Sequence, residues 1–427
     1  MDNFKLTKPI RLIELFAGIG SQAMALKNIG ADFENYKVVE FDKYAIKSYN
    51  AIHGTNFETM DITNIKGNDL EITDIDKYDY VMTYSFPCQD LSVAGKQQGM
   101  AKGSGTRSGL LWEVERLLNE CEELPQVLLM ENVPQVHGKK NIEHFNKWIE
   151  FLENKGYSNY WQDLNAKDFG IPQSRNRCFM ISIRGGQKYS FPKPIELKLR
   201  LKDVLEDEVD EKYYLSKMIQ KRLKITDETF TKNIIGNTKP DFRTIGERDN
   251  VYSTDGIIGT LTATDYKQPK QILEVIRLGG IFDNDKSKHQ AGSIYNTEGL
   301  APTLSTMQGG YRQPCIKTIK ISEDEPQVKN PLKDKTEYGW HFEQQVYDDS
   351  GIIRTLKAGG GSGNIPKTNT HSLIVRKLTP KECWRLMGFA DADFEKAEKV
   401  NSNSQLYKQA GNSIVVNVLE AIFKQMM

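Results

Sequence analysis

The stretch "LFAGIGSQA", Leu15 to Ala23, decides the fold class of this chain. It follows the apolar run "RLIE" and leads into "MALKNIGA", so the pattern predicts a strand, a tight glycine turn and a helix. The spacing Gly18-x-Gly20-x-x-Ala23 matches the dinucleotide fingerprint, and Glu40 stands where an acid would hold a ribose. The turn therefore predicts a cofactor with a nucleoside part, and it leaves open whether that cofactor is a nicotinamide dinucleotide.

The sequence up to about residue 185 alternates strand-like and helix-like segments, which is typical of an α/β sheet covered by helices. Helical patterns lie at 44–53, 110–121 and 142–156, the last ending on Gly156. Strands are expected at 12–15, 37–40, 80–84, 127–130 and 178–183. From about Gly185 a charged, helix-leaning stretch at 196–223 gives way to glycine- and threonine-rich sequence that favours strands. We place a domain boundary at this change.

Composition limits the class of protein. The chain has 427 residues, enough for two or more domains, and its 57 basic residues equal its 57 acidic ones. A polyanionic partner would therefore have to meet a local basic surface. The five cysteines form no Cys-x-x-Cys pair, which disfavours a zinc cluster and a disulfide framework. With no apolar signal region and no long apolar run, we expect a soluble, cytoplasmic protein without a metal site.

Three segments repeat one frame: "VYSTDGIIGTLTA" at 251–263, "IYNTEGLAPTLST" at 294–306 and "VYDDSGIIRTLKA" at 346–358. A polar loop and a second β-leaning run follow each segment. One interpretation is three hairpins from a duplicated scaffold. The alternative is that side chains of the loops contact the phosphates and bases of a nucleic acid, with Lys267, Lys270, Tyr266, Tyr311, Arg312 and Lys367 as candidates.

A second motif, "SFPCQDLS" from Ser85 to Ser92, places Cys88 just beyond the carboxyl end of an expected strand. Open α/β sheets bind their ligands at such ends. A lone cysteine is usually a small buried hydrophobe, but here Pro87 fixes the backbone and Gln89 and Asp90 make the setting polar. We expect an exposed thiol whose pKa is lowered and which acts as a nucleophile.

Two further motifs carry candidate catalytic side chains. In "MENVPQV", Glu131 either caps a helix or pairs with a lysine, or it faces Cys88 and is held protonated to donate to a substrate ring nitrogen. In "QSRNRCF", Arg175 and Arg177 project to the same side if the segment is extended. They serve either phosphate and salt-bridge contacts or the recognition of a substrate carbonyl.

Taken in order, "LFAGIGS", "FPCQDLS", "ENV", "QSRNR" and "GNSIVVNVL" resemble the motifs of the C5-cytosine DNA methyltransferases in order and spacing. A nicotinamide enzyme would need none of the last four. The resemblance covers residues 10–185 and 376–427. It implies a Rossmann-like S-adenosylmethionine-dependent methyltransferase sheet built from 1–185 and 376–427, with the C-terminal helix docked back on it. Residues 186–375 would form a second target-recognition domain, mostly β and loop.

The resemblance implies S-adenosylmethionine as the cofactor, with S-adenosylhomocysteine as its product. Glu40 would hold the ribose, Asp61 and Ile62 would flank the adenine, and Asn412 and Ser413 would close the site. The full set expected to bind the cofactor is Phe16, Gly18, Gly20, Glu40, Phe41, Asp61, Ile62, Pro87, Leu110, Asn412 and Ser413.

The same resemblance implies the chemistry. Cys88 would add to C6 of a cytosine flipped out of duplex DNA, Glu131 would act at N3 and N4, and Arg177 would contact O2. Arg175 would support Arg177 or bind phosphate, and the segment 92–109 would be a mobile lid. The expected DNA contacts are Gln89, Ser92, Lys96, Arg107, Thr260, Thr303 and Thr355.

Alternatives to this interpretation remain at the sequence level. An RNA cytosine-5 methyltransferase of the same fold would share Cys88 and Glu131, whereas a catalytically dead regulator would lack the cysteine or the glycine turn. The three repeats form either one reader of the DNA target or, as in some phage-type relatives, separate readers. We expect a monomer from a bacterium or phage, and a separately acting restriction endonuclease is a partner that the resemblance allows.

Overall fold

The computed structural model describes residues 4–88, 90–91, 99–213 and 374–427. It also describes 224–225, 234–237, 250–274 without 255, 264, 266 and 268, and the strands at 277–280, 293–296, 315–317, 328–329, 346–347 and 367–368. Among these residues, no helix has the length and apolar character that crossing a membrane requires.

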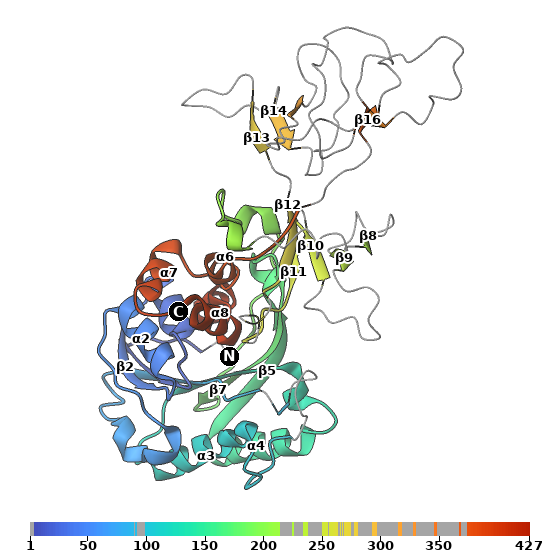
Figure 1. Ribbon diagram of the computed structural model, residues 1–427. Coiled ribbons are helices and arrows are strands. Elements are labelled where there is room, and N and C mark those ends of the chain that lie inside the picture. The colour runs from blue at the N-terminus through green and yellow to red at the C-terminus, as the bar shows by residue number, and fades with distance from the viewer. Residues whose placement is uncertain are drawn as a thin grey trace, which may run out of the picture.

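A six-stranded sheet in the order β2-β1-β3-β4-β7-β5 lies between the helices of the main folded body (Figure 1). Its strands are β1 (Ile10–Leu15), β2 (Phe33–Val39), β3 (Asp79–Tyr84), β4 (Val127–Asn132), β5 (Tyr157–Asn165) and β7 (Asn176–Arg184). The first four run parallel, and β7 is antiparallel to both β4 and β5. The predicted α/β fold class and its five predicted strands are confirmed, while β5 was not predicted.

Helices cover both faces of this sheet. They are α1 (Ser21–Asn28), α2 (Lys43–His53), α3 (Leu111–Glu120), α4 (Ile142–Asn154), α6 (Pro380–Arg385), α7 (Asp391–Glu398), α8 (Asn403–Asn412) and α9 (Val416–Lys424). Figure 1 shows α3 and α4 on one face and the C-terminal helices on the other. Met130 belongs to the same hydrophobic cluster as Trp148 of α4 on the first face, and Leu129 belongs to the same cluster as Leu419 of α9 on the second. Gly156 has a φ of 86°, which confirms the predicted end of α4.

Short 3₁₀ turns connect these elements, at η1 (Ile62–Asn64), η2 (Gly67–Leu70), η3 (Arg107–Leu110), η4 (Pro134–His137), η5 (Ala166–Phe169), η6 (Leu201–Val204) and η7 (Glu211–Tyr213). The predicted helical character of 196–223 is wrong for its described part, since only η6 and η7 form there. Arg385 donates to the carbonyls of Val204 and Leu205, so tertiary contacts take up carbonyls that a longer helix would use itself.

The C-terminal segment packs beside the beginning of the chain. α9 lies against α1, the amide of Ile414 donates to Ser21 Oγ over 3.3 Å, and Lys408 pairs with Asp42 at 2.6 Å. Tyr189, Leu201 and Leu261 belong to the same hydrophobic cluster as Leu419. Packing is therefore continuous across residue 185, and the division into two domains at that point stays a prediction.

The three repeats share one strand arrangement. In each, the strand that begins the repeat pairs in parallel with a later strand: β10 (Asn250–Ser253) with β12 (Gln271–Glu274), β14 (Ser293–Asn296) with β15 (Cys315–Lys317), and β17 (Val346–Tyr347) with β18 (Lys367–Thr368). The hairpin interpretation is therefore wrong for these pairs, because a hairpin joins antiparallel strands. In each repeat the stretch of sequence between the two paired strands is long enough to connect parallel strands.

The other strands complete this pattern. β9 (Ile234–Asn237), β13 (Arg277–Gly280) and β16 (Val328–Lys329) pair antiparallel with β10, β14 and β17. β8 (Lys224–Ile225) pairs with β9, and β19 (Ile374–Lys377) pairs with β12. The first repeat also joins the central body, because β11 (Ile258–Gly259) pairs with β6 (Gln173–Ser174).

Candidate active site

The glycine turn after β1 is held in a backbone conformation that few residues adopt. Gly18 and Gly20 have φ of 59° and 81° in the left-handed region, and Phe16 shares it at 59°. At Gly20 a Cβ atom would lie 2.3 Å from His53 Nε2 and 2.6 Å from the ring of Tyr49. The second glycine of the motif is therefore required by both its φ and the close approach of α2.

The predicted ribose ligand, Glu40, lies directly against this turn. Its Oε2 accepts from the amide of Gly18 over 2.9 Å, and its Oε1 accepts from the amide of Asp42 over 2.8 Å. Burial raises the pKa of Glu40, and these two backbone hydrogen bonds oppose the rise. Because a carboxylate has about four lone-pair sites, it retains the capacity to accept from hydroxyl groups as well.

Phe41 and the segment of Asp61 and Ile62 lie beside Glu40, and we call these four residues the Glu40 cradle. The side chain of Phe41 is 74% exposed, and the amide of Met60 donates to the Glu40 carbonyl over 2.8 Å. That bond brings the segment of Asp61 and Ile62 next to Glu40. An acid for hydroxyl groups and an exposed aromatic ring suit a nucleoside, so these residues fit a cofactor of that kind.

The remaining cofactor candidates come from distant parts of the chain. Ser413 is buried and donates through Oγ to the Gln409 carbonyl over 2.7 Å, while the neighbouring Asn412 is exposed. Leu110 ends η3 immediately before α3, and Pro87 precedes Cys88. β1 and β3 are neighbours in the sheet, so the glycine turn and the Cys88 loop leave it at the same edge, where the strand order reverses.

Two buried polar side chains fix the Cys88 loop. Asn132 Nδ2 donates to the Phe86 carbonyl over 2.9 Å, and Ser108 Oγ donates to the Pro87 carbonyl over 2.7 Å. Neither side chain was singled out from the sequence. The signal for Asn132 was its place in "ENV" beside Glu131, whereas Ser108 gave no comparable signal.

Pairing of β4 with β7 brings Glu131 and Arg177 together. Glu131 lies opposite Phe179, so Arg177, two residues along, projects from the same face. The Arg177 Nε lies 3.2 Å from Glu131 Oε1. Burial raises the pKa of Glu131, while the charges of Arg177 and Arg175 oppose the rise. Burial thus favours the protonated carboxyl group, whereas the adjacent guanidinium of Arg177 favours the carboxylate.

Cys88 lies within the electrostatic reach of this pair. Burial raises the pKa of its thiol, the charge of Glu131 raises it further, and Arg177 and Arg175 lower it. The expected lowered pKa is therefore wrong for the free protein. The thiol is half-buried against an apolar cluster, and this loss of hydration outweighs the two arginines.

Arg175 has a different environment from Arg177. Only 4% of it is exposed, Nη1 donates to the Leu261 carbonyl over 2.8 Å, and Nη2 donates to the Ser413 carbonyl over 2.7 Å. Burial and the charge of Arg177 lower its pKa to about 9. Phosphate binding by Arg175 does not fit this arrangement, since its guanidinium joins the first repeat to the C-terminal segment instead.

Most of the expected DNA contacts, Gln89, Ser92, Lys96, Thr303 and Thr355, lie outside the described residues, as do Tyr266, Tyr311 and Arg312. Arg107 is exposed in η3. Thr260 Oγ1 donates to the Ser174 carbonyl over 2.8 Å. Lys270 is only 2% exposed, so its suggested contact with phosphate is wrong in this arrangement.

The described part of the expected lid is attached to α3 at Met100 and Lys102. Met100 is fully buried, and its carbonyl accepts from Trp112 Nε1 over 2.7 Å. Residues 102–105 and Arg107 are exposed, and residues 92–98 lie outside the described part, so the lid stays a prediction.

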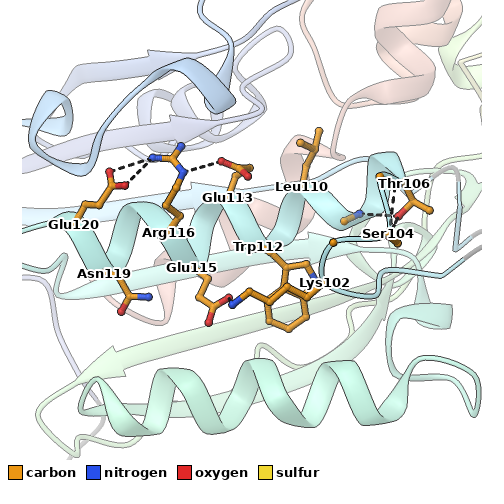
Figure 2. Close-up of a pocket in the computed structure, with 13 residues that line it drawn as sticks. Lys102, Ser104, Thr106, Leu110, Trp112, Glu113, Glu115, Arg116, Asn119 and Glu120 are labelled. Atoms are coloured by element: carbon orange, nitrogen blue, oxygen red, sulfur yellow. Dashed lines mark hydrogen bonds and ion pairs between the residues drawn. The ribbon is translucent and has the colours of Figure 1, made fainter.

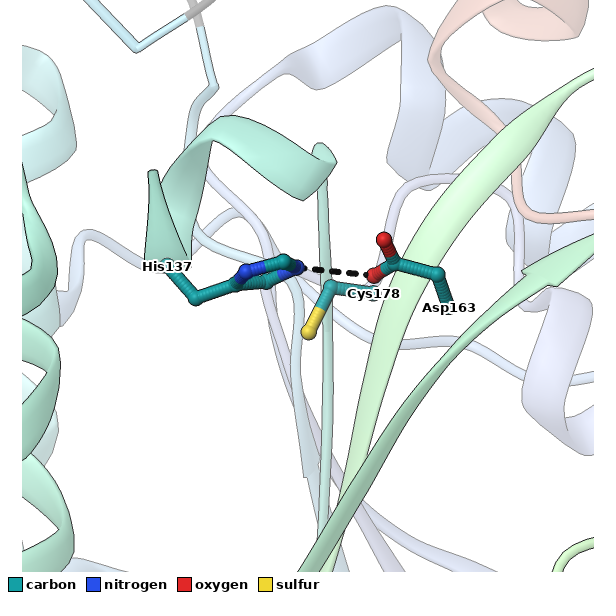
Figure 3. A group of neighbouring side chains, drawn as sticks. All are labelled: His137, Asp163 and Cys178. Atoms are coloured by element: carbon teal, nitrogen blue, oxygen red, sulfur yellow. Dashed lines mark hydrogen bonds and ion pairs between the residues drawn. The ribbon is translucent and has the colours of Figure 1, made fainter. Parts of the chain in front are cut away.

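One group among the described residues has metal-ligand types: His137, Asp163 and Cys178, whose ligand atoms lie within 4.8 Å of one another (Figure 3). His137 Nε2 and Asp163 Oδ1 are 3.0 Å apart, which is a hydrogen bond. Zinc would need each ligand atom about 2.0–2.3 Å from one centre. Cys178 belongs to the hydrophobic cluster of Met130 and Met180, on the sheet face opposite Glu131. We assign no metal to this group.

Residues 10–427 match the sequence pattern of a protein family that is described as C-5 cytosine-specific DNA methylase. The chain belongs to this family. It is 32% identical to the orphan methyltransferase M.SPBetaI of Bacillus phage SPbeta, over 98% of this chain and 97% of that protein. It is 30% identical to the type II methyltransferase M.HhaI of Haemophilus parahaemolyticus, over 97% and 93%. Membership makes the chain an enzyme of the DNA cytosine-5 methyltransferase class, as the sequence predicts.

Solved structures agree with this fold. A methyltransferase of Entamoeba histolytica superposes with a TM-score of 0.60 at 15% identity, covering 98% of both chains. The Dnmt2 methyltransferase of S. pombe superposes with a TM-score of 0.55 at 18% identity, covering 97% of both chains. At such identities the likeness concerns the architecture, which is the predicted α/β methyltransferase fold.

Proposed function

We propose that this protein transfers a methyl group from S-adenosylmethionine to C5 of a cytosine that is flipped out of duplex DNA. The observation that supports the proposal is that Cys88 lies within the electrostatic reach of the Glu131–Arg177 pair, on a loop that leaves the sheet next to the glycine turn held by Glu40. The family match and the relatives named above favour DNA over the RNA alternative.

The cofactor-binding part of the proposal rests on the cradle. Glu40 would hold the ribose hydroxyls, Asp61 and Ile62 would flank the adenine, and Asn412 and Ser413 would close the site. The remaining residues of the set, which would line the site, are Phe16, Gly18, Gly20, Phe41, Pro87 and Leu110. When bound, S-adenosylmethionine supplies the methyl group as an electrophile.

The nucleophile in this proposal is Cys88. Its Sγ, once deprotonated, adds to C6 of the cytosine, and the electron pair of the C5–C6 double bond moves into the ring. C5 then carries the electron density that takes up the methyl group. A base removes the C5 proton, the Sγ–C6 bond breaks, and the double bond returns as Cys88 leaves.

Glu131 and Arg177 stabilise the charge that this addition creates. A protonated Glu131 donates to N3, and Arg177 contacts O2, so the ring is neutralised as Sγ attacks. The raised pKa of Glu131 favours its protonated form for this task. The raised pKa of Cys88 keeps the thiol protonated in the free enzyme, which limits its reaction with other electrophiles.

The substrate region of the proposal is the sequence between 186 and 375. A base inside a duplex is inaccessible to Cys88, so the cytosine must leave the stack. The repeats and the Gln89 to Arg107 segment would hold the DNA around it. We propose further that the enzyme acts as a monomer in the cytoplasm of a bacterial cell, with any restriction endonuclease acting separately.

The test is to incubate the protein with S-adenosylmethionine and unmethylated genomic DNA and to map 5-methylcytosine at single-base resolution. Methylation at one short motif supports a single reader, and unrelated motifs support separate readers. Methylation of a transfer RNA and not of duplex DNA would contradict the proposal.

A matched pair of variants tests the nucleophile. Cys88→Ser should bind cofactor and DNA normally but lower the methylation rate by roughly 10⁴-fold or more, because a serine hydroxyl is a far weaker nucleophile. Cys121→Ser, at another half-buried free cysteine, should keep the wild-type rate. Normal turnover by Cys88→Ser would refute the covalent mechanism.

A further inference from the structure

A groove of about 820 Å³ runs along α3, and Arg116 lies in it between two glutamates of its own helix (Figure 2). Arg116 Nε lies 2.8 Å from Glu113 Oε2, and Nη1 lies 3.0 Å from Glu120 Oε2. Glu113 is one turn before Arg116 and Glu120 is one turn after it, so the two carboxylates hold the guanidinium along one face of α3.

The same guanidinium crosses to a second segment of the chain. Arg116 Nη2 donates to the Ile62 carbonyl and Nη1 donates to the Ile65 carbonyl, each over 2.9 Å. The side chains of Ile62 and Ile65 are 4% and 7% exposed and pack in the core. The segment therefore buries its side chains and turns these two carbonyls towards α3.

A second contact ties the end of this segment to α3. Glu120 Oε2 accepts from the amide of Gly67 over 2.8 Å. A Cβ atom at Gly67 would lie 2.6 Å from both the Leu117 carbonyl oxygen and the Cys121 amide nitrogen. The backbone of 62–67 thus follows α3 closely, with Arg116 and Glu120 as its polar anchors.

The anchored segment is the one proposed to flank the adenine, and this inference rests on that proposed function. Met60 joins its beginning to Glu40, and α3 itself starts directly after Leu110, another proposed wall of the cofactor site. We infer that Arg116 is a positioning residue that sets the adenine side of the cofactor site through the Ile62 and Ile65 carbonyls. α3 thus positions Leu110 directly, at its own beginning, and positions the Ile62 segment through Arg116.

The chemistry of arginine suits this role. Its planar guanidinium offers several donors at once and bridges two carbonyls and two carboxylates, whereas a lysine ammonium is a single point charge. Apart from the three-residue turn η1, residues 61–66 have no regular structure to fix them. Their placement depends on these polar contacts together with the packing of Ile62 and Ile65 in the core.

The experiment measures S-adenosylmethionine binding by calorimetry and steady-state methylation for the full-length protein. Arg116→Gln should raise the Kd and the KM for S-adenosylmethionine about tenfold, which is about 1.4 kcal/mol. Its kcat at saturating cofactor and its KM for DNA should stay within about twofold of wild type. Arg116→Lys should show a smaller rise, because one carbonyl keeps a cationic donor.

Glu115→Gln is the matched control, since Glu115 lines the same groove but pairs with Lys102. It should keep the wild-type Kd. A wild-type Kd for Arg116→Gln would overturn the inference, and so would an equal loss of kcat and cofactor affinity that follows a lowered Tm. Failure of the wild-type protein to bind S-adenosylmethionine is a separate result, because it rejects the proposed function itself.

Discussion

Glu14 is a carboxyl group buried at the end of β1, immediately before the glycine turn. It is 0% exposed, Tyr49 Oη donates to its Oε2 over 2.5 Å, and the amide of Ala23 donates to its Oε1 over 3.4 Å. Burial raises the pKa of Glu14 from 4.5 to about 7, and these two hydrogen bonds oppose the rise. The glycine turn therefore lies next to a carboxyl group, Glu14, whose pKa is close to neutral pH.

This raised pKa predicts how stability depends on pH. Between pH 4.5 and about 7 the folded protein holds a proton on Glu14 that the unfolded chain releases. The stabilisation is thus fully present below pH 4.5 and is lost as the pH rises through about 7. The side chain of Glu14→Gln stays neutral at every pH. As the pH rises from 4.5 to about 7, the free energy of unfolding of this variant minus that of wild type should therefore increase by up to about 3 kcal/mol.

Urea denaturation of both proteins at pH 5, 6, 7 and 8 measures this difference. Glu58→Gln, at an exposed glutamate, is the control and should follow the wild-type curve. Parallel curves for wild type and Glu14→Gln would show that Glu14 ionises in the folded protein at its ordinary pKa.

At the scale of elements, the Cys88 loop depends on donors from its neighbours. Asn132 at the end of β4 and Ser108 in η3 each donate to one carbonyl just before the cysteine. The position of Cys88 matters for catalysis, because a small displacement of a nucleophile lowers the rate of the chemical step strongly. We expect Asn132→Ala to lower kcat by about 10- to 100-fold with little change in the KM for S-adenosylmethionine.

Rates at saturating DNA, with Tm measured in parallel, test this expectation. Asn154→Ala, at the exposed end of α4, is the control for the substitution itself. An Asn132→Ala enzyme with the wild-type kcat would mean that Ser108 alone positions the loop.

Elements differ in how far the sequence predicted them. β3 and β4 are buried along their whole length and appear as apolar runs, so their positions were predicted. β5 was missed because it is an edge strand with Trp161 43% exposed, and its polar residues give no regular alternation. The strand pairing in the repeats was wrong because local sequence does not state which strand a segment pairs with.

At the scale of the whole molecule, three distant segments meet at one joint. Arg175 binds the carbonyls of Leu261 in the first repeat and of Gly411 and Ser413 in the C-terminal segment. Gly411 lies so close to the first repeat that a Cβ atom would be 2.1 Å from the Thr262 carbonyl carbon. The first repeat is therefore docked on the catalytic body through Gly411 and Arg175.

This close packing predicts the effect of Gly411→Ala. Alanine favours a helix interior over glycine by about 1 kcal/mol, so α8 alone would be stabilised. The steric conflict should instead lower the stability of the whole protein by about 1–3 kcal/mol and displace the neighbouring Ser413. Thermal unfolding and S-adenosylmethionine binding measure both effects. An increase in Tm would show that the first repeat can move away from residue 411 without a loss of stability.

The sequence alone determined the α/β fold class, the family, the glycine turn and the candidates Cys88, Glu131 and Arg177. These features are local, because a strand, a tight turn and a motif are each written in neighbouring residues. The family match and the sheet order agree with the fold class and the family. The catalytic roles of these residues remain proposals that the experiments above test.

Only the tertiary structure decided how these residues act on one another. It half-buries Cys88 within reach of the Glu131 charge and so raises the pKa of the thiol, gives Arg175 a joining role, and reveals Asn132, Ser108 and Arg116. Each of these features depends on burial or on a partner far away in the chain. Desolvation and long-range hydrogen bonds exist only once the sheet has brought those partners together, so no local pattern could have stated them.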